Sequence, residues 1–163
     1  MAKQNLLPEK LYKKIRTVMP MVGVDLLIKT KDGLLLGVRK LPPGAGCKWP
    51  IGGRMMYGES LEGAVRRKAK EEAGIDVKII RRVGVYSTVF TKKSGQKRHT
   101  VNVVYLVKMV GGRLKCNSEY SKFLFAKRMD KKLPSYTAAI IRESGVFGKV
   151  QGKPTRSKDY FVI

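Results

Sequence analysis

The stretch from residue 53 to residue 75 constrains the fold most, because it contains a helix whose start and end are both marked. Ser60 is a residue type that caps helix starts, and Gly74 is one that ends helices in the left-handed conformation. Between them the apolar positions fall on one face and are mostly small: Leu61, Ala64, Val65, Ala69 and Ala73. Small side chains let a helix approach its neighbour closely. The stretch therefore predicts a helix over 60–73 that packs on a sheet, preceded by a glycine-rich loop.

Carboxylates are concentrated in the same stretch. The chain has 35 Lys and Arg residues but only 12 Asp and Glu. Four of those acids lie here, at Glu59, Glu62, Glu71 and Glu72. Adjacent carboxylates near one helix end are oxygen ligands suited to Mg²⁺ or Mn²⁺. The pattern predicts a divalent-cation site.

Three arginines in or near this stretch suit an anionic substrate. Arg39, Arg54 and Arg67 carry guanidinium groups, which bind phosphate oxygens through two parallel hydrogen bonds. A bound metal activates water and neutralises charge, while arginines hold the leaving group. Together these residues predict hydrolysis of a pyrophosphate bond.

Outside this stretch the pattern predicts one domain of mixed α and β structure over residues 1–163. We expect helices over residues 9–18, within an N-terminal segment 1–19, and over 135–144. We expect strands over 21–29, 34–39, about 76–91, about 98–110 and around Leu114. The Asp32-Gly33 pair predicts a hairpin turn, residues 41–46 a loop, and residues 92–97 a polar turn. Residues 149–163 are expected to form a loosely held basic tail.

The net charge of +23 favours polyanionic partners, among them nucleotides and RNA. It also fits a proteome rich in lysine, as in thermophiles. No apolar run is long enough to span a membrane, and the N-terminus lacks the apolar segment of a signal peptide. Cys47, Cys116 and the single histidine are too few for a Cys/His zinc site. We expect a cytoplasmic protein with no membrane partner.

Residues 53–75 resemble the Nudix box, G-x5-E-x7-R-E-U-x-E-E-x-G-U, where U is a bulky aliphatic residue. Two positions depart from it: Lys68 replaces the glutamate of the REU element, and Ala69 is a small version of U. The likeness extends over about residues 20–128. It implies an α+β fold, an α/β/α sandwich with a mixed β-sheet. It also implies a hydrolase of nucleoside diphosphates linked to a further group.

Within the family, the chain is similar to the GDP-mannose mannosyl hydrolase branch, which also lacks the REU glutamate. The resemblance implies that Gly53 provides a carbonyl to Mg²⁺ or Mn²⁺ and that Glu72, with Glu71, provides carboxylates. Arg39 and Arg54 would contact the diphosphate, and Arg67 would support substrate binding. These enzymes cleave the C–O bond at the sugar carbon with inversion, whereas Nudix hydrolysis usually cleaves P–O. They tend to be homodimers.

Lys68 leaves a second interpretation open. Its ammonium stands one helical turn from Glu72, where it would compete with a metal ion for the carboxylate. Arg67 with Glu71 and Lys68 with Glu72 are also i, i+4 pairs, which stabilise a solvated helix face. The branch has a base histidine in the loop after the last main strands. Glu119 is the acid of that loop here, so it is the candidate catalytic base or third ligand.

The alternative function is an RNA- or ribosome-associated protein that uses a Nudix scaffold with weak or no catalysis. It would account for the part of the charge that a nucleotide hydrolase does not need. The sequence does not define the base, the sugar or the bond that is cleaved.

Overall fold

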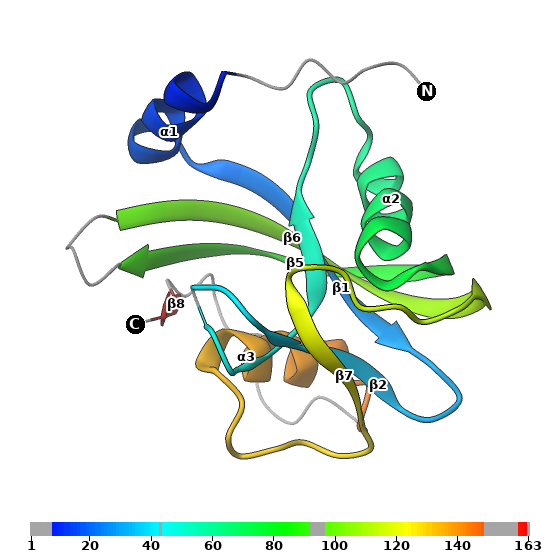
Figure 1. Cartoon of the computed structure of the whole chain (residues 1–163). Helices are drawn as coiled ribbons and strands as arrows, with labels where there is room; N and C mark the ends of the chain where they lie inside the picture. The colour runs from blue at the N-terminus through cyan, green and yellow to red at the C-terminus, as the bar shows by residue number, and fades with distance from the viewer. Residues whose placement is uncertain (1–7, 43, 92–96, 149–159, 163) are drawn as a thin grey trace.

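The computed structural model describes residues 8–42, 44–91, 97–148 and 160–162, which form three helices and one eight-stranded sheet (Figure 1). The helices are α1 (Glu9–Val18), α2 (Leu61–Ala73) and α3 (Ser135–Ser144). The strands are β1 (Met21–Lys29), β2 (Leu34–Arg39), β3 (Lys48–Trp49), β4 (Ile51–Arg54), β5 (Ile75–Thr91), β6 (Lys97–Gly112), β7 (Tyr120–Ala126) and β8 (Tyr160–Val162).

The sheet is mixed, as expected. Its order is β3-β2-β1-β6-β5-β8, with β4 also paired to β1 and β7 to β2. The β1–β6 and β5–β8 pairs are parallel, and the remaining pairs are antiparallel. One edge of β1 is shared between two partners, because Gly23–Leu26 pair with β4 while Ile28 and Lys29 pair with β2. The strand that leads into α2 is thereby fixed to the centre of the sheet.

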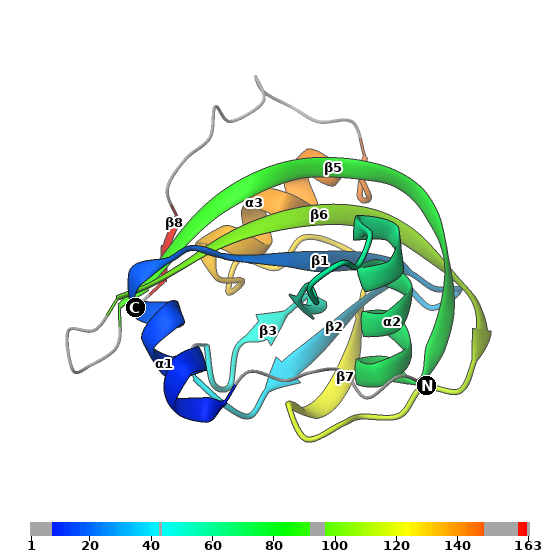
Figure 2. The same cartoon turned by 90° about the horizontal axis from the view of Figure 1, so that it is seen from above.

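Helices α2 and α3 lie on opposite faces of the sheet (Figure 2). The α2 face is packed with Leu26 of β1 together with small helix residues such as Ala64 and Ala69. The α3 face is packed with the next β1 residue, Leu27, together with Ile140. Both faces of β1 are buried, which explains why its sequence is largely apolar. The expected α/β/α sandwich is confirmed.

The boundaries of α2 follow the predicted signals. The Ser60 hydroxyl accepts a hydrogen bond of 3.0 Å from the Gly63 N–H, and Gly74 closes the helix at φ 73°. The helices over 9–18 and 135–144, the hairpin at 30–33 and the two long strands also lie where the pattern places them. Of the predicted turn over 92–97, residues 92–96 lie outside the described residues.

Two local predictions were wrong, and one strand was not predicted. The strand around Leu114 is absent, because Gly112 turns the chain at φ 85° and the Lys115 N–H then donates to the Ala73 carbonyl at 3.0 Å. A strand, β7, begins instead at Tyr120 and pairs with β2. The glycines expected in a loop before α2 belong to β4.

The C-terminal segment is described only in part. Residues 160–162 form β8, which pairs in parallel with Thr88–Phe90 of β5. The sequence did not predict this strand. The rest of the predicted tail, residues 149–159 and 163, lies outside the described residues. Across the described part of the chain, the helices are too short or too polar to cross a lipid bilayer.

Candidate active site

The carboxylate of Glu72 lies buried between α2 and β4, with its side chain only 3% exposed. Its Oε2 atom accepts a hydrogen bond from the Gly52 N–H at 3.3 Å and another from the Tyr120 hydroxyl at 3.1 Å. Its Oε1 atom lies 3.2 Å from the Lys68 ammonium. Burial raises the pKa of Glu72, Lys68 lowers it, and the nearby Glu119 carboxylate raises it further.

Lys68 bridges the two carboxylates at the end of α2. Its Nζ atom lies 3.2 Å from both Glu71 Oε2 and Glu72 Oε1. Glu71 is half-exposed, whereas Lys68 is largely covered. A Cβ on Gly53 would lie 2.9 Å from Lys68 Cε, so glycine at this position makes room for the lysine side chain. The Lys68–Glu72 pair expected from their helical spacing is therefore present.

Three nitrogen atoms of Arg67 donate hydrogen bonds to acidic side chains. Its Nε and Nη2 atoms each donate to Glu59 at 2.7 Å, and its Nη1 donates to Glu71 at 3.0 Å. Its Nη2 also donates to the Arg54 carbonyl at 3.1 Å. The two-pronged contact with Arg67 lowers the pKa of Glu59. This arrangement joins the loop before α2 to the helix and to β4.

Arg39 and Glu119 lie together beside the end of β2. Their side chains approach to 3.9 Å, and the Arg39 guanidinium lies 5.8 Å from the centre of the Trp49 ring. The loop that carries Glu119 is anchored, since its N–H donates to Asn117 Oδ1 and its carbonyl accepts from the Lys40 N–H, both at 2.8 Å. Glu119 thus has a fixed backbone and a side chain that reaches solvent.

Arg54 lies on the other side of β4, towards α1. Its guanidinium stacks over the ring of Tyr12 at 4.3 Å from the ring centre. The structure therefore brings Glu71, Glu72 and Gly53 together around Lys68. It pairs Arg39 with Glu119 and Arg67 with Glu59. Arg54 follows Gly53 in the chain, but its side chain packs against the N-terminal helix.

Asp25 is a buried acid beside this site that the sequence reasoning missed. The Tyr136 hydroxyl donates a hydrogen bond to it, and a Cβ on Gly52 would lie 2.5 Å from its Oδ1. Burial raises the pKa of Asp25 to about 6, the Tyr136 hydrogen bond lowers it, and the negative charge of Glu72 raises it. An acidic residue inside an otherwise apolar strand was the signal in the sequence. Tyr120, which contacts Glu72, gave no comparable signal.

The donor set suits a divalent cation only if Lys68 moves. The Lys68 ammonium already occupies the position between Glu71 and Glu72, and so acts as a stand-in cation there. Two carboxylates are enough for Mg²⁺ when substrate phosphates and water complete its coordination. Within the described ranges, no group of three or more His, Cys, Asp or Glu side chains is arranged to hold a metal. The chain therefore provides some of the ligands that Mg²⁺ needs, and substrate and water would provide the rest.

Residues 19–132 match the family model of the NUDIX domain, and the chain belongs to the Nudix hydrolase family. It is 33% identical to an ADP-ribose pyrophosphatase of Methanocaldococcus jannaschii over 117 residues, which is 71% of this chain and 68% of that protein. It is 29% identical over 119 residues to the low-salt glycan biosynthesis protein Agl8 of Haloferax volcanii, covering 71% of this chain and 76% of that protein.

Solved structures agree with this assignment. A MutT NUDIX hydrolase from Burkholderia pseudomallei superposes with a TM-score of 0.66 and 26% identity, over 77% of this chain and 98% of that one. A MutT protein from Methanosarcina mazei has the same fold at a TM-score of 0.62 and 23% identity, over 78% and 95% of the two chains. The protein is a Nudix hydrolase that acts on nucleoside diphosphate derivatives.

Proposed function

We propose that this hydrolase is metal-dependent and acts on a nucleotide sugar, with GDP-mannose and ADP-ribose as the first substrates to test. One observation carries the proposal: the Nudix-box carboxylate Glu72 is buried at the end of α2 and paired with a cation. Burying a carboxylate destabilises the folded protein unless the carboxylate is paired with a cation or coordinates a metal. The relatives' names, an ADP-ribose pyrophosphatase and a glycan biosynthesis protein, support a sugar-containing substrate.

Mg²⁺ or Mn²⁺ would be held by Glu71, Glu72 and the Gly53 carbonyl, with Lys68 displaced from between the two carboxylates. A Cβ on Gly23 would lie 3.0 Å from the Gly53 carbonyl oxygen, so glycine at position 23 keeps a side chain from crowding that oxygen. The bound metal would neutralise charge on the diphosphate and lower the pKa of a water molecule.

The chain's own cations would bind the substrate. Arg39 is held over Trp49 and would hydrogen-bond one phosphate. Arg54, which stacks on Tyr12 in this structure, would turn from that ring to bind the other. Arg67 is proposed to support binding indirectly. Its contacts to Glu59, Glu71 and the Arg54 carbonyl hold the segment from which Arg54 extends.

Glu119 is the proposed general base. Its side chain is 42% exposed and sits on an anchored loop, so it can accept a proton from an attacking water. The Arg39 guanidinium, 3.9 Å away, would hold this carboxylate beside the bound diphosphate.

A panel of nucleotide sugars, dinucleoside polyphosphates and capped RNA, assayed with Mg²⁺ or Mn²⁺, tests the proposal. We expect turnover of at least one nucleotide sugar and a loss of about 10²-fold or more in Glu72→Gln. Glu62→Gln is the matched control, because Glu62 lies in the first turn of the same helix and is exposed. Turnover that persists in Glu72→Gln would refute the proposed role of this carboxylate.

Hydrolysis in ¹⁸O-labelled water identifies the bond that is cleaved. Attack at the sugar carbon places the label in the released sugar, as the resemblance to the mannosyl hydrolase branch implies. Attack at phosphorus places the label in a phosphate product. The expected dimer is checked independently by light scattering at assay concentration.

RNA association is a second candidate, favoured by one surface feature. A hollow of about 800 Å³ is lined by four basic side chains, Lys29, Lys31, Lys108 and Arg113, together with Phe125. Basic grooves with an aromatic side chain suit single-stranded nucleic acid. Binding of a short oligoribonucleotide should then weaken steeply with salt and fall in Lys108→Gln. No binding at about 150 mM salt would exclude this candidate.

A further inference from the structure

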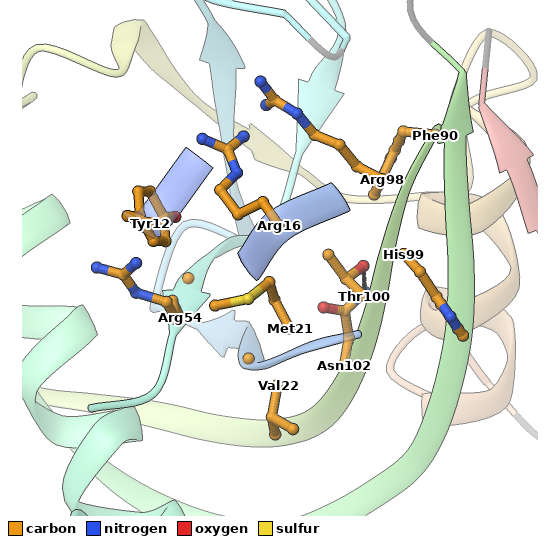
Figure 3. Close-up of a pocket in the computed structure, with 12 residues that line it drawn as sticks. Tyr12, Arg16, Met21, Val22, Arg54, Phe90, Arg98, His99, Thr100 and Asn102 are labelled. Carbon is orange, nitrogen blue, oxygen red and sulfur yellow. Dashed lines mark hydrogen bonds between the residues drawn. The ribbon is translucent and has the colours of Figure 1, made fainter. Parts of the chain in front are cut away.

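A second cavity of about 190 Å³ opens on the far side of Gly53, between α1, β4 and the start of β6. Its lining combines Tyr12 and Arg16 of α1, Arg54 of β4, and Arg98 of β6 (Figure 3). A water molecule takes up about 30 Å³ in the liquid, so the cavity has room for a phosphate group and several waters. Because Gly53 and Arg54 line it, the cavity adjoins the proposed diphosphate site.

Among the residues that the structure describes, the three arginines of this cavity have no acidic partner. Over the described ranges, no carboxylate oxygen lies within 4.0 Å of the guanidinium groups of Arg16, Arg54 or Arg98. Arg16 and Arg54 instead flank the Tyr12 ring, at 5.0 and 4.3 Å from its centre (Figure 3). Arg67, by contrast, is saturated by Glu59 and Glu71.

Two of these arginines, Arg16 and Arg98, also repel each other. Burial lowers the pKa of Arg98, and the neighbouring charge of Arg16 lowers it further. Like charges brought together without a counter-ion destabilise the protein unless an anion joins them. The guanidinium groups of Arg16 and Arg98, which line one cavity and feel each other's charge, are suited to phosphate, since phosphate can accept hydrogen bonds from both.

Two of the lining residues come from outside the part of the chain that matches the family. The NUDIX match begins at residue 19, whereas Tyr12 and Arg16 belong to α1. The helix contacts β6, and none of its residues is buried. Its contribution to the cavity therefore lies outside the matched family domain, and removing a single side chain there leaves the core intact.

We propose that α1 and the start of β6 complete a second anion site. It binds a phosphate group that the nucleotide substrate carries in addition to its scissile diphosphate. The inference deepens the proposed function and rests on it for the identity of the ligand. The preferred substrates would then be nucleoside diphosphate derivatives with an additional phosphomonoester.

The first experiment measures binding of inorganic phosphate to the metal-free, full-length protein by calorimetry at 150 mM salt. We expect Arg16→Gln and Arg98→Gln each to weaken binding about tenfold, as the loss of a charged hydrogen bond implies. Lys14→Gln and Lys97→Gln remove the same charge from exposed neighbouring positions and should leave binding unchanged. Arg16→Lys, which keeps the charge, should retain most of it.

The second experiment compares binding of ADP-ribose with binding of its 2′-phosphate under the same conditions. Wild type should bind the phosphorylated nucleotide about tenfold more tightly, and this ratio should fall to about one in Arg16→Gln and Arg98→Gln. Neither experiment depends on turnover, so an inactive enzyme would refute the proposed function without affecting the anion site.

Three results would overturn the inference. Equal losses in all four glutamine variants would show that only the general positive field attracts phosphate. In the second result, phosphate binding depends on Arg16 and Arg98 while the two nucleotides bind equally well. That result would show that the anion site does not bind the extra phosphate of the substrate. An oligoribonucleotide that binds more tightly than either nucleotide, and loses affinity in Arg16→Gln, would assign the cavity to RNA.

Discussion

Lys68 Nζ lies 3.2 Å from Glu72 Oε1, and Lys68 occupies the helix position where the Nudix box carries a glutamate. One negative side chain of the box is therefore replaced by a positive one, in contact with the carboxylate that remains. The ammonium also reaches Glu71. A divalent cation that binds these two carboxylates must first displace a resident positive charge.

Lys68→Met should tighten Mg²⁺ binding and weaken the metal-free fold. Loss of the ammonium removes the competitor, so we expect about tenfold tighter Mg²⁺ binding. It also leaves Glu72 unpaired, which should lower the free energy of unfolding without metal by about 1–3 kcal/mol. Thermal unfolding with increasing Mg²⁺ measures both effects.

Lys70→Met is the matched control for this prediction. Lys70 lies on the same helix and pairs with Asp76, but both side chains are more than half exposed. Neither Mg²⁺ binding nor stability should change by more than about 0.5 kcal/mol. Equal Mg²⁺ affinity in wild type and Lys68→Met would contradict the competition.

Arg67→Lys should destabilise the protein because a lysine cannot reproduce the paired contacts to Glu59. The free energy of unfolding should fall by about 1–3 kcal/mol, measured by urea titration. Arg66→Lys, at an exposed neighbouring position, is the control and should have little effect. A large rise in KM with unchanged stability would instead indicate that Arg67 contacts the substrate directly.

Tyr120→Phe should lower both stability and kcat. The hydroxyl lies 3.1 Å from Glu72 Oε2 and 3.2 Å from the Pro50 carbonyl, and Tyr120 is completely buried. Its removal deprives the Glu72 carboxylate of one donor, at about 1–2 kcal/mol of unfolding free energy. Tyr57→Phe, at a fully exposed position, should match wild type in both measurements.

Asp25 should make the protein less stable as the pH rises from about 4 to 6. The folded state holds the Asp25 proton up to its raised pKa of about 6, while the unfolded chain releases it near 3.8. The unfolded state therefore binds fewer protons in this window, and folding free energy is lost as pH increases. The full loss, reached above pH 6, is about 3 kcal/mol.

The variant Asp25→Asn isolates this effect, because it keeps an oxygen acceptor for the Tyr136 hydroxyl and cannot ionise. Its unfolding free energy relative to wild type should rise between pH 4 and pH 7, as measured by urea titration at each pH. Asp32→Asn, an exposed change in the 30–33 turn, should show no such trend. A pH-independent difference for Asp25→Asn would refute the raised pKa.

Local signals in the sequence predicted the elements that depend on local interactions. Ser60 and Gly74 bound α2 as expected, and Asp32-Gly33 turns the first hairpin. The helical spacing of Lys68 and Glu72 also predicted their ion pair. In each case the partner lies within a few residues along the chain.

Contacts between distant segments could not be predicted in this way. The two glycines of β4 have low strand propensity, and they become a strand because they pair with β1. β7 likewise depends on its pairing with β2, where a Cβ on Gly37 would lie 2.2 Å from the Tyr120 ring. The pairing that buries Asp25 under Tyr136 joins residues separated by most of the chain.

Helix α1 buries none of its residues, while the carboxylates of the site sit on elements that form the core. Mutations in α1 should therefore destabilise the protein less than changes around Glu72. Helix α1, proposed to help select the substrate, is thus free to evolve at a different rate from the carboxylate site proposed to cleave it. Related chains would differ first in their N-terminal helix.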